Sequence, residues 1–123
     1  MNSKEIVLKQ IEEYNNQDME KCLDYCDDQI EVFLLPEGET LFKGKDVLKG
    51  HLEKSFGTDD FEEVEVLEII ALGRYVTTIE KKTKKSTGKS RTLLITYLVT
   101  DSKVQTMWAA RQEELEIRVI DHP

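Results

Sequence analysis

Apolar residues in the first half of the chain recur with helical spacing. Val7, Ile11 and Tyr14 form one helical stripe, and charged residues lie mostly elsewhere. The run "NNQD" then ends the pattern, because Asn and Asp side chains compete for nearby backbone groups. The spacing predicts a first helix over residues 3–15.

A second helix follows after a sharp break. Asp18 is its predicted N-cap. Four residues then keep the i, i+3, i+4, i+7 spacing of one helical face, namely Met19, Cys22, Leu23 and Cys26. We expect this helix to run through Cys26 and to end against Asp27 and Asp28, although their negative charges are unfavourable at a helix C-terminus.

The pattern then changes to alternation. In "IEVFLL", Ile30, Val32 and Leu34 fall on one face of a predicted strand. The segment "PEGE" predicts a turn and "TLFKG" a short second strand.

A third helix is predicted in "VLKGHLEKSF". Its apolar residues Leu48, Leu52 and Phe56 repeat every four positions, and Asp46 is the predicted cap.

The second half of the chain predicts four long strands, at residues 61–72, 74–83, 91–100 and 104–114. The links "LGR", "KKSTGKS" and "TDSK" join them. If "DS" is a two-residue turn, Tyr97 pairs with Thr106 and Ile95 with Trp108, so that Tyr97 and Trp108 share a face. Residues 1–114 form the expected domain, and residues 115–123 extend the last strand or form an extended arm.

Charge is distributed unevenly along the first of these hairpins. Acidic residues precede the turn and basic residues follow it: Glu62, Glu63, Glu65 and Glu68, then Lys81, Lys82, Lys84 and Lys85. Folding about Gly73 brings the two groups together, where cross-strand pairs help to set the register. A nucleic-acid-binding loop is disfavoured, because no aromatic residues are interleaved with the lysines.

Composition limits the function classes. The chain has 123 residues, enough for one domain, and a formal net charge of −8. The acidic surface disfavours nucleic acids and anionic membranes as partners. Apolar runs of at most four residues argue against a membrane span, and an amphipathic N-terminus without a secretory signal favours a cytoplasmic location.

Metal and cofactor sites are not expected. Cys22 and Cys26 are interpreted as a reduced, buried pair. A metal site would need more ligands, and neither His51 nor His122 lies at a recognisable spacing from them. No glycine-rich phosphate loop is present.

Three segments together resemble the NTF2-like superfamily, in its SnoaL-like and ketosteroid-isomerase-like branch. They are "IEEYNNQDMEKCLDYCDDQIEVFLLPEG", "LFKGKDVLKGHLEKSF" and "YLVTDSKVQTMW". The shared features are an aromatic–Asn–x–x–Asp break, an acidic pair before the first strand, a basic–Gly–basic entry to the third helix and a late hairpin followed by Trp. In that hairpin Ser102 replaces the usual Gly, and Val104 the usual Ile.

The resemblance implies an α+β cone. A curved, mixed, mostly antiparallel six-stranded sheet would wrap three helices and leave an apolar cavity, in the order helix, helix, strand, strand, helix and four strands. A second copy commonly covers the outer sheet face in this family. The segment "RTLLITYLV" agrees with that, since both of its faces are largely apolar. A homodimer through the outer face is therefore expected.

The resemblance also implies where a steroid-isomerase site would lie. The tyrosine, the general-base aspartate and the protonated aspartate of catalytic relatives align with Gln10, Leu34 and Ile95. None of these can exchange a proton, so the isomerase mechanism does not transfer. His51 and Tyr14 are the remaining weak candidates for acid–base catalysis.

Six residues are expected to line the cavity: Gln10, Tyr14, Leu34, Phe56, Tyr97 and Trp108. They suit a small, mostly apolar ligand, or they close over one another and fill the cone. Glu80 and Arg111 could bring charge to the mouth, depending on strand register.

Three functions remain open. The first is a small apolar-ligand-binding or scaffold domain with no assignable reaction. The second is an isomerase, cyclase or dehydratase acting on a small hydrophobic substrate, and the third is a protein-interaction module that dimerises.

Overall fold

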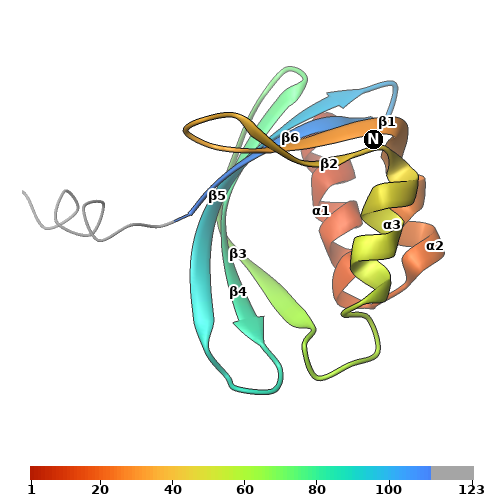
Figure 1. Cartoon of the computed structure of the whole chain (residues 1–123). Coiled ribbons are helices and arrows are strands. Elements are labelled where there is room, and N and C mark those ends of the chain that lie inside the picture. The colour runs from red at the N-terminus through yellow and green to blue at the C-terminus, as the bar shows by residue number, and fades with distance from the viewer. Residues whose placement is uncertain (112–123) are drawn as a thin grey trace, which may run out of the picture.

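A strongly curved sheet wraps around three helices in the computed structural model, which describes residues 1–111 (Figure 1). The helices are α1 (Ser3–Asn15), α2 (Met19–Asp24) and α3 (Lys45–Glu53). The strands are β1 (Cys26–Leu34), β2 (Glu39–Lys43), β3 (Glu62–Leu72), β4 (Tyr75–Lys84), β5 (Ser90–Thr100) and β6 (Lys103–Arg111). The predicted α+β cone is confirmed.

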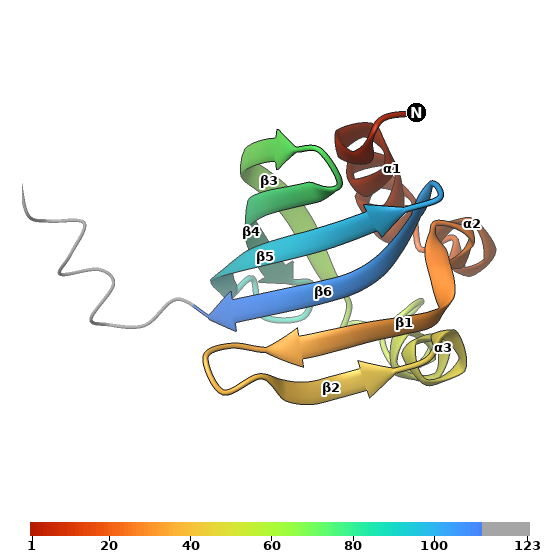
Figure 2. The same ribbon diagram turned by 90° about the horizontal axis from the view of Figure 1, so that it is seen from above.

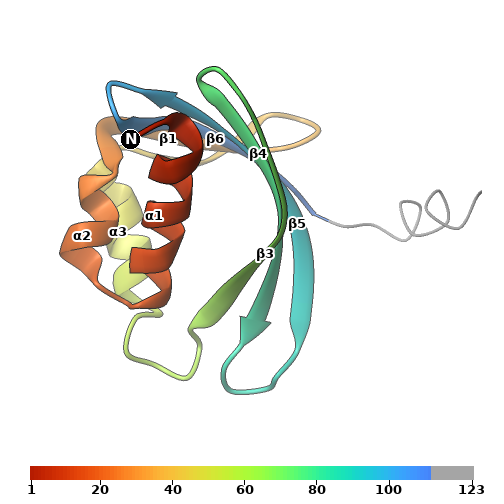
Figure 3. The same ribbon diagram turned by 180° about the vertical axis from the view of Figure 1, so that it is seen from behind.

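The strands follow the spatial order β2-β1-β6-β5-β4-β3 (Figure 2). Only the β1–β6 pair is parallel among these neighbours. All three helices lie on the concave side of the sheet (Figure 3). The core forms there, around Val7, Ile30, Val76, Tyr97 and Val104, each no more than 1% exposed.

The second helix is shorter than its pattern predicted. It ends at Asp24, and Cys26 is the first residue of β1. The reason is tertiary: the Tyr25 carbonyl accepts a hydrogen bond from Val104 N at 2.7 Å, which starts the pairing of β1 with β6. Sheet pairing therefore replaces the last predicted helical turn, and Asp27 and Asp28 lie on a strand rather than at a helix end.

The third helix also begins differently from the prediction. Its N-cap is Gly44, not Asp46, and the backbone of Gly44 has φ 95°, which favours glycine. Phe56 lies beyond the last helical residue, Glu53.

The long strands agree with their predicted ranges to within about two residues over the described part of the chain. The β3–β4 hairpin turns at Gly73 and sets Glu65 opposite Lys81 and Glu62 opposite Lys84, as its charge pattern predicted. Residues 112–114 of the last predicted strand, and the arm at 115–123, lie outside the described residues.

Asn15 explains why the helical pair breaks where it does. Its side-chain amide donates to the Val64 carbonyl at 2.8 Å and accepts from Val64 N at 2.9 Å. Since β3 is an edge strand, this amide satisfies two backbone groups that no further strand can reach. Next to it, the Tyr14 hydroxyl donates to the Glu62 carbonyl at 2.9 Å. The end of α1 is thus fixed to the open edge of the sheet.

We predict that Asn15→Ala lowers the free energy of unfolding by about 1–3 kcal/mol, because two partly buried backbone groups lose their partner. Urea denaturation measures the change. Asn16→Ala is the matched control, since within residues 1–111 the Asn16 side chain bonds only to Glu13, at 3.1 Å. Equal destabilisation by the two variants would contradict this role for Asn15.

Candidate ligand-binding cavity

A cavity of about 480 Å³ lies between helices α1 and α3 and the concave face of the sheet. Strand register orders its wall into layers. Met107, Ala109 and Arg111 of β6 stand opposite Tyr97, Ile95 and Leu93 of β5. Further along, Leu93 pairs with Glu80 of β4, and Arg91 with Lys82. The wall therefore changes from apolar in one part to charged in another.

The apolar part is formed by residues of six elements, α1, α3, β1, β3, β5 and β6. They include Ile11, Val32, Leu48, Leu52, Val64, Leu93, Ile95 and Met107. Apolar walls with a few polar groups are typical of sites for small organic molecules.

A buried carboxyl group interrupts this apolar surface. Glu80 is 2% exposed, and its Oε2 accepts hydrogen bonds from the hydroxyls of Thr78, at 2.5 Å, and Tyr97. Burial, reinforced by the negative charge of Glu80, raises the pKa of Tyr97 well above its usual value. The Tyr97 phenol consequently stays protonated and continues to donate.

The second oxygen of Glu80 faces the cavity. Its Oε1 makes no hydrogen bond within residues 1–111, yet no buried side-chain oxygen or nitrogen in that range lacks a partner. Oε1 therefore keeps a small exposed area, within the 2% exposure of the residue, and Glu80 lines the cavity. An accessible carboxyl oxygen in an otherwise apolar space can accept a proton or a hydrogen bond from a ligand.

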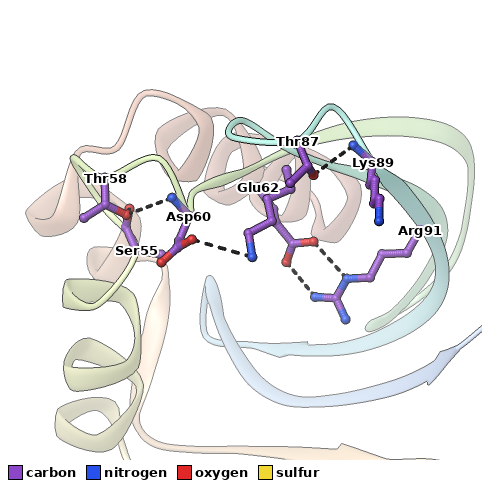
Figure 4. A network of polar contacts seen from close by, with 8 residues as sticks. Ser55, Thr58, Asp60, Glu62, Thr87, Lys89 and Arg91 are labelled. Carbon is purple, nitrogen blue, oxygen red and sulfur yellow. Dashed lines mark hydrogen bonds and ion pairs between the residues drawn. The ribbon is translucent and has the colours of Figure 1, made fainter.

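Arginine and lysine side chains surround one end of the cavity. Arg91 forms a two-bond fork with Glu62, from Nε to Oε2 at 3.0 Å and from a terminal nitrogen to Oε1 at 2.7 Å (Figure 4). Lys84 pairs with Asp60 at 3.6 Å. Lys82 differs: within the described chain its Nζ has no carboxylate partner and lies 5.9 Å from the centroid of the Tyr14 ring.

No protein-family model and no curated protein matches this sequence. Solved structures do match. A proposed ketosteroid isomerase from Kribbella flavida is 13% identical, with a TM-score of 0.78 over 90% of this chain and 78% of that one. An NTF2-like protein of unknown function from Cytophaga hutchinsonii is 13% identical, with a TM-score of 0.76 over 91% of each chain.

A SnoaL-like protein of unknown function from Burkholderia thailandensis is also similar, at 14% identity and a TM-score of 0.72 over 90% of this chain and 94% of that one. The chain has the NTF2-like fold. At these identities the likeness concerns the fold alone.

The structure brings most of the predicted site residues together. Gln10, Tyr14, Leu34, Tyr97 and His51 all line the cavity. The two exceptions are Phe56, which packs against Tyr14 and Phe61, and Trp108.

Trp108 lies on the opposite, convex face. The register shifts by one residue between Leu98 and Val99, so Trp108 pairs with Thr96 and Met107 with Tyr97. This β-bulge turns Met107, rather than Trp108, toward the cavity. Trp108 instead stacks on Phe33, with ring centroids 6.4 Å apart. The predicted sharing of a face by Tyr97 and Trp108 is wrong for this reason.

The two candidate acid–base residues differ in what they can do. The Tyr14 hydroxyl is committed to the Glu62 carbonyl, and burial raises its pKa. His51 packs on Phe42, with ring centroids 4.4 Å apart, and burial together with Lys82 lowers its pKa below 6.5. A neutral imidazole at the cavity wall is therefore expected at pH 7.

The three positions aligned with an isomerase site, Gln10, Leu34 and Ile95, do line the cavity. The ionisable groups lie elsewhere, at Glu80, Tyr97 and Lys82. The sequence does signal them: in "VTTIEKK" the alternate positions 76, 78, 80 and 82 share one strand face. Only the register reveals that this face is the concave one.

The two cysteines are free and buried, as expected. They do not share a helix face, because Cys26 belongs to β1, but Cys26 Sγ lies 3.8 Å from the Cys22 carbonyl oxygen. Gln10 Nε2 donates to Cys26 Sγ at 3.6 Å. Burial raises the pKa of Cys22 to about 12 and that of Cys26 to about 11. Within residues 1–111, no group of three or more His, Cys, Asp or Glu side chains is placed to hold a metal ion.

Proposed function

We propose that this protein binds a small, mostly apolar molecule inside the cone. The cavity between α1, α3 and the sheet carries this proposal, because about 480 Å³ of apolar-walled space is of the size that small ligands occupy. A domain that served only as a scaffold would gain stability by filling such a volume, since unfilled core space is destabilising.

Polar groups inside the cavity support binding rather than mere imperfect packing. Burying Glu80 and half-burying Lys82 costs free energy. Apolar residues at positions 80 and 82 would make the fold more stable, so stability alone does not explain the charged ones. A role in recognising a ligand, or in acting on it, explains why Glu80 and Lys82 are present in the cavity.

A second candidate function is proton transfer within the bound molecule, and Glu80 favours it. Its Oε1 is accessible, while Thr78 and Tyr97 hold Oε2 in place. A fixed carboxylate in a mostly apolar space is suited to remove a proton from carbon next to a carbonyl and to return it. This candidate replaces His51 and Tyr14 by Glu80 as the expected base.

We further propose that two copies associate through the convex face. Ile70, Leu72 and Tyr75 lie together on this face and are 71%, 83% and 47% exposed. On the same face of β5, Leu98 stands opposite Tyr75, and Leu94, 36% exposed, stands opposite Ile79. Contiguous exposed apolar surface is typical of interaction sites.

No helix within residues 1–111 is long and apolar enough to cross a bilayer. The free thiols of Cys22 and Cys26 support a reducing compartment, and a cytoplasmic location remains a prediction.

Filling the cavity should abolish binding. Ala109 lines the cavity and Ala110, its neighbour, points to the convex face. We predict that Ala109→Phe weakens binding of naphthalene-2-methanol by at least about tenfold, because the ring occupies ligand volume. Ala110→Phe should bind like the natural chain. Titration calorimetry measures both, and equal binding by the two variants would place the ligand outside the cone.

Proton transfer can be measured without knowing the substrate. Deuterium exchange at the carbons next to the carbonyl of 2-tetralone, followed by NMR in deuterated water, tests for it. We predict that Glu80→Gln slows the protein-catalysed exchange by about 100-fold or more. Glu65→Gln, an exposed position on β3, is the control. Exchange no faster than in buffer would reject this candidate and leave ligand binding intact.

If two copies associate, sedimentation at micromolar concentration should give a mass of about twice the 14.3 kDa of the chain. Leu94→Lys should dissociate the pair, because it places a charge within an apolar contact. Leu8→Lys is the control, since Leu8 is 38% exposed on helix α1. A monomeric natural chain would overturn the proposed dimer.

A further inference from the structure

Lys82 is a cavity-lining cation without a carboxylate partner in the described part of the chain. We propose that the cavity binds an amphipathic carboxylate, whose anionic head group pairs with Lys82 while its apolar body lies against Leu93 and Ile95. This inference rests on the proposed ligand binding and names the chemical class of the ligand.

Two cations next to Lys82 each have a carboxylate partner, whereas Lys82 has none within residues 1–111. Arg91 stands opposite Lys82 in register and is held by Glu62. Lys84, two residues further along β4, is held by Asp60 at 3.6 Å. Of these three neighbouring cations, Lys82 alone makes no ion pair and no side-chain hydrogen bond within residues 1–111. Its ammonium lies over the Tyr14 ring, 5.9 Å from the centroid, and the charges of Glu80 and Glu62 act on it without forming an ion pair within residues 1–111.

The remaining charges of the cavity also favour an anion. Arg111 lines it as a second cation, and His51 is neutral at pH 7 because its pKa is lowered. Against these stands Glu80, whose Oε2 already accepts from Thr78 and Tyr97. Counted over the whole lining, Lys82, Arg91 and Arg111 balance Asp60, Glu62 and Glu80. Arg91 pairs with Glu62, and Asp60 pairs with Lys84. Among the lining residues within 1–111, the charges without an ion pair are therefore Lys82, Arg111 and Glu80, an excess of one positive charge.

The position of Lys82 fixes the orientation of the ligand. The wall is apolar around Ile95, Ala109 and Met107. It becomes charged beside Leu93, at Glu80 and Arg111, and then at Lys82 and Arg91. A molecule with one anionic end and an apolar body matches this division. A carboxylate fits better than a phosphate dianion, because Lys82 and Arg111 together exceed Glu80 by one positive charge.

Loss of hydration at Lys82 is the energetic reason why a carboxylate should bind there. Burial lowers the pKa of Lys82, which means that the surroundings stabilise its ammonium less well than water does. A bound carboxylate would supply the missing stabilisation through a charge-assisted hydrogen bond.

Three probes with the same ring system test the sign of the charge: 2-naphthoate, naphthalene-2-methanol and 2-naphthylmethylammonium. We expect the natural chain to bind the anion best and the cation worst, with about tenfold or more between the anion and the alcohol. Calorimetry gives the affinities. The ¹³C-methyl signal of Met107, which lines the cavity, reports that the probe lies inside, and the exposed Met1 serves as the internal reference.

Lys82→Met should remove the preference for 2-naphthoate and leave the affinity for the alcohol unchanged or higher. Lys81→Met is the matched control, because Lys81 is exposed on the opposite face of the same strand and the change in net charge is identical. It should keep the preference.

The outcomes separate this inference from the proposed function. If the alcohol binds as well as 2-naphthoate, or if Lys82→Met and Lys81→Met bind the anion equally, the carboxylate proposal is overturned while ligand binding stands. If no probe shifts the Met107 signal of the natural chain, both are overturned.

Discussion

The parallel pairing of β1 with β6 is the constraint on which the structure depends. It joins the first strand of the chain to the last described one and places β1 between β2 and β6. The pairing starts at the Tyr25 carbonyl, so α2 must end at once and the chain must pass directly from helix to sheet. That short connection holds the helices against the concave face, where the cavity forms.

The elements themselves could be predicted from periodicity, because helices and strands repeat their apolar residues at different intervals. The predicted end of α2 was wrong, since the helical spacing of Cys22 and Cys26 also suits a helix followed by an extended residue. Only the distant partner Val104 distinguishes the two. Gly44 shows the same limit: its positive φ caps α3, although Asp46 is the better cap by side-chain chemistry.

The candidate site was predictable in its lining and not in its chemistry. Gln10, Tyr14 and Leu34 lie at the cavity wall, and family resemblance could indicate this because it fixes which side of each element faces inward. The bulge in β6 reversed the faces of Met107 and Trp108, and a one-residue insertion of this kind leaves little trace in an apolar–polar pattern. Whether Glu80 and Lys82 face the cavity likewise depends on strand register, which the sequence pattern does not reveal. The positions aligned with a steroid-isomerase site hold no acid, and the ionisable groups instead occupy β4.

Trp108 and Phe33 stack on the convex face, with the thickness of the sheet between them and the cavity. Since Trp108 is the single tryptophan of the chain, its emission senses the outer surface of the sheet. Quenching or a spectral shift of this indole would therefore follow contact with another macromolecule, whereas loading of the hollow interior would leave its spectrum almost unchanged. One side chain thus provides an optical signal that separates assembly from occupancy.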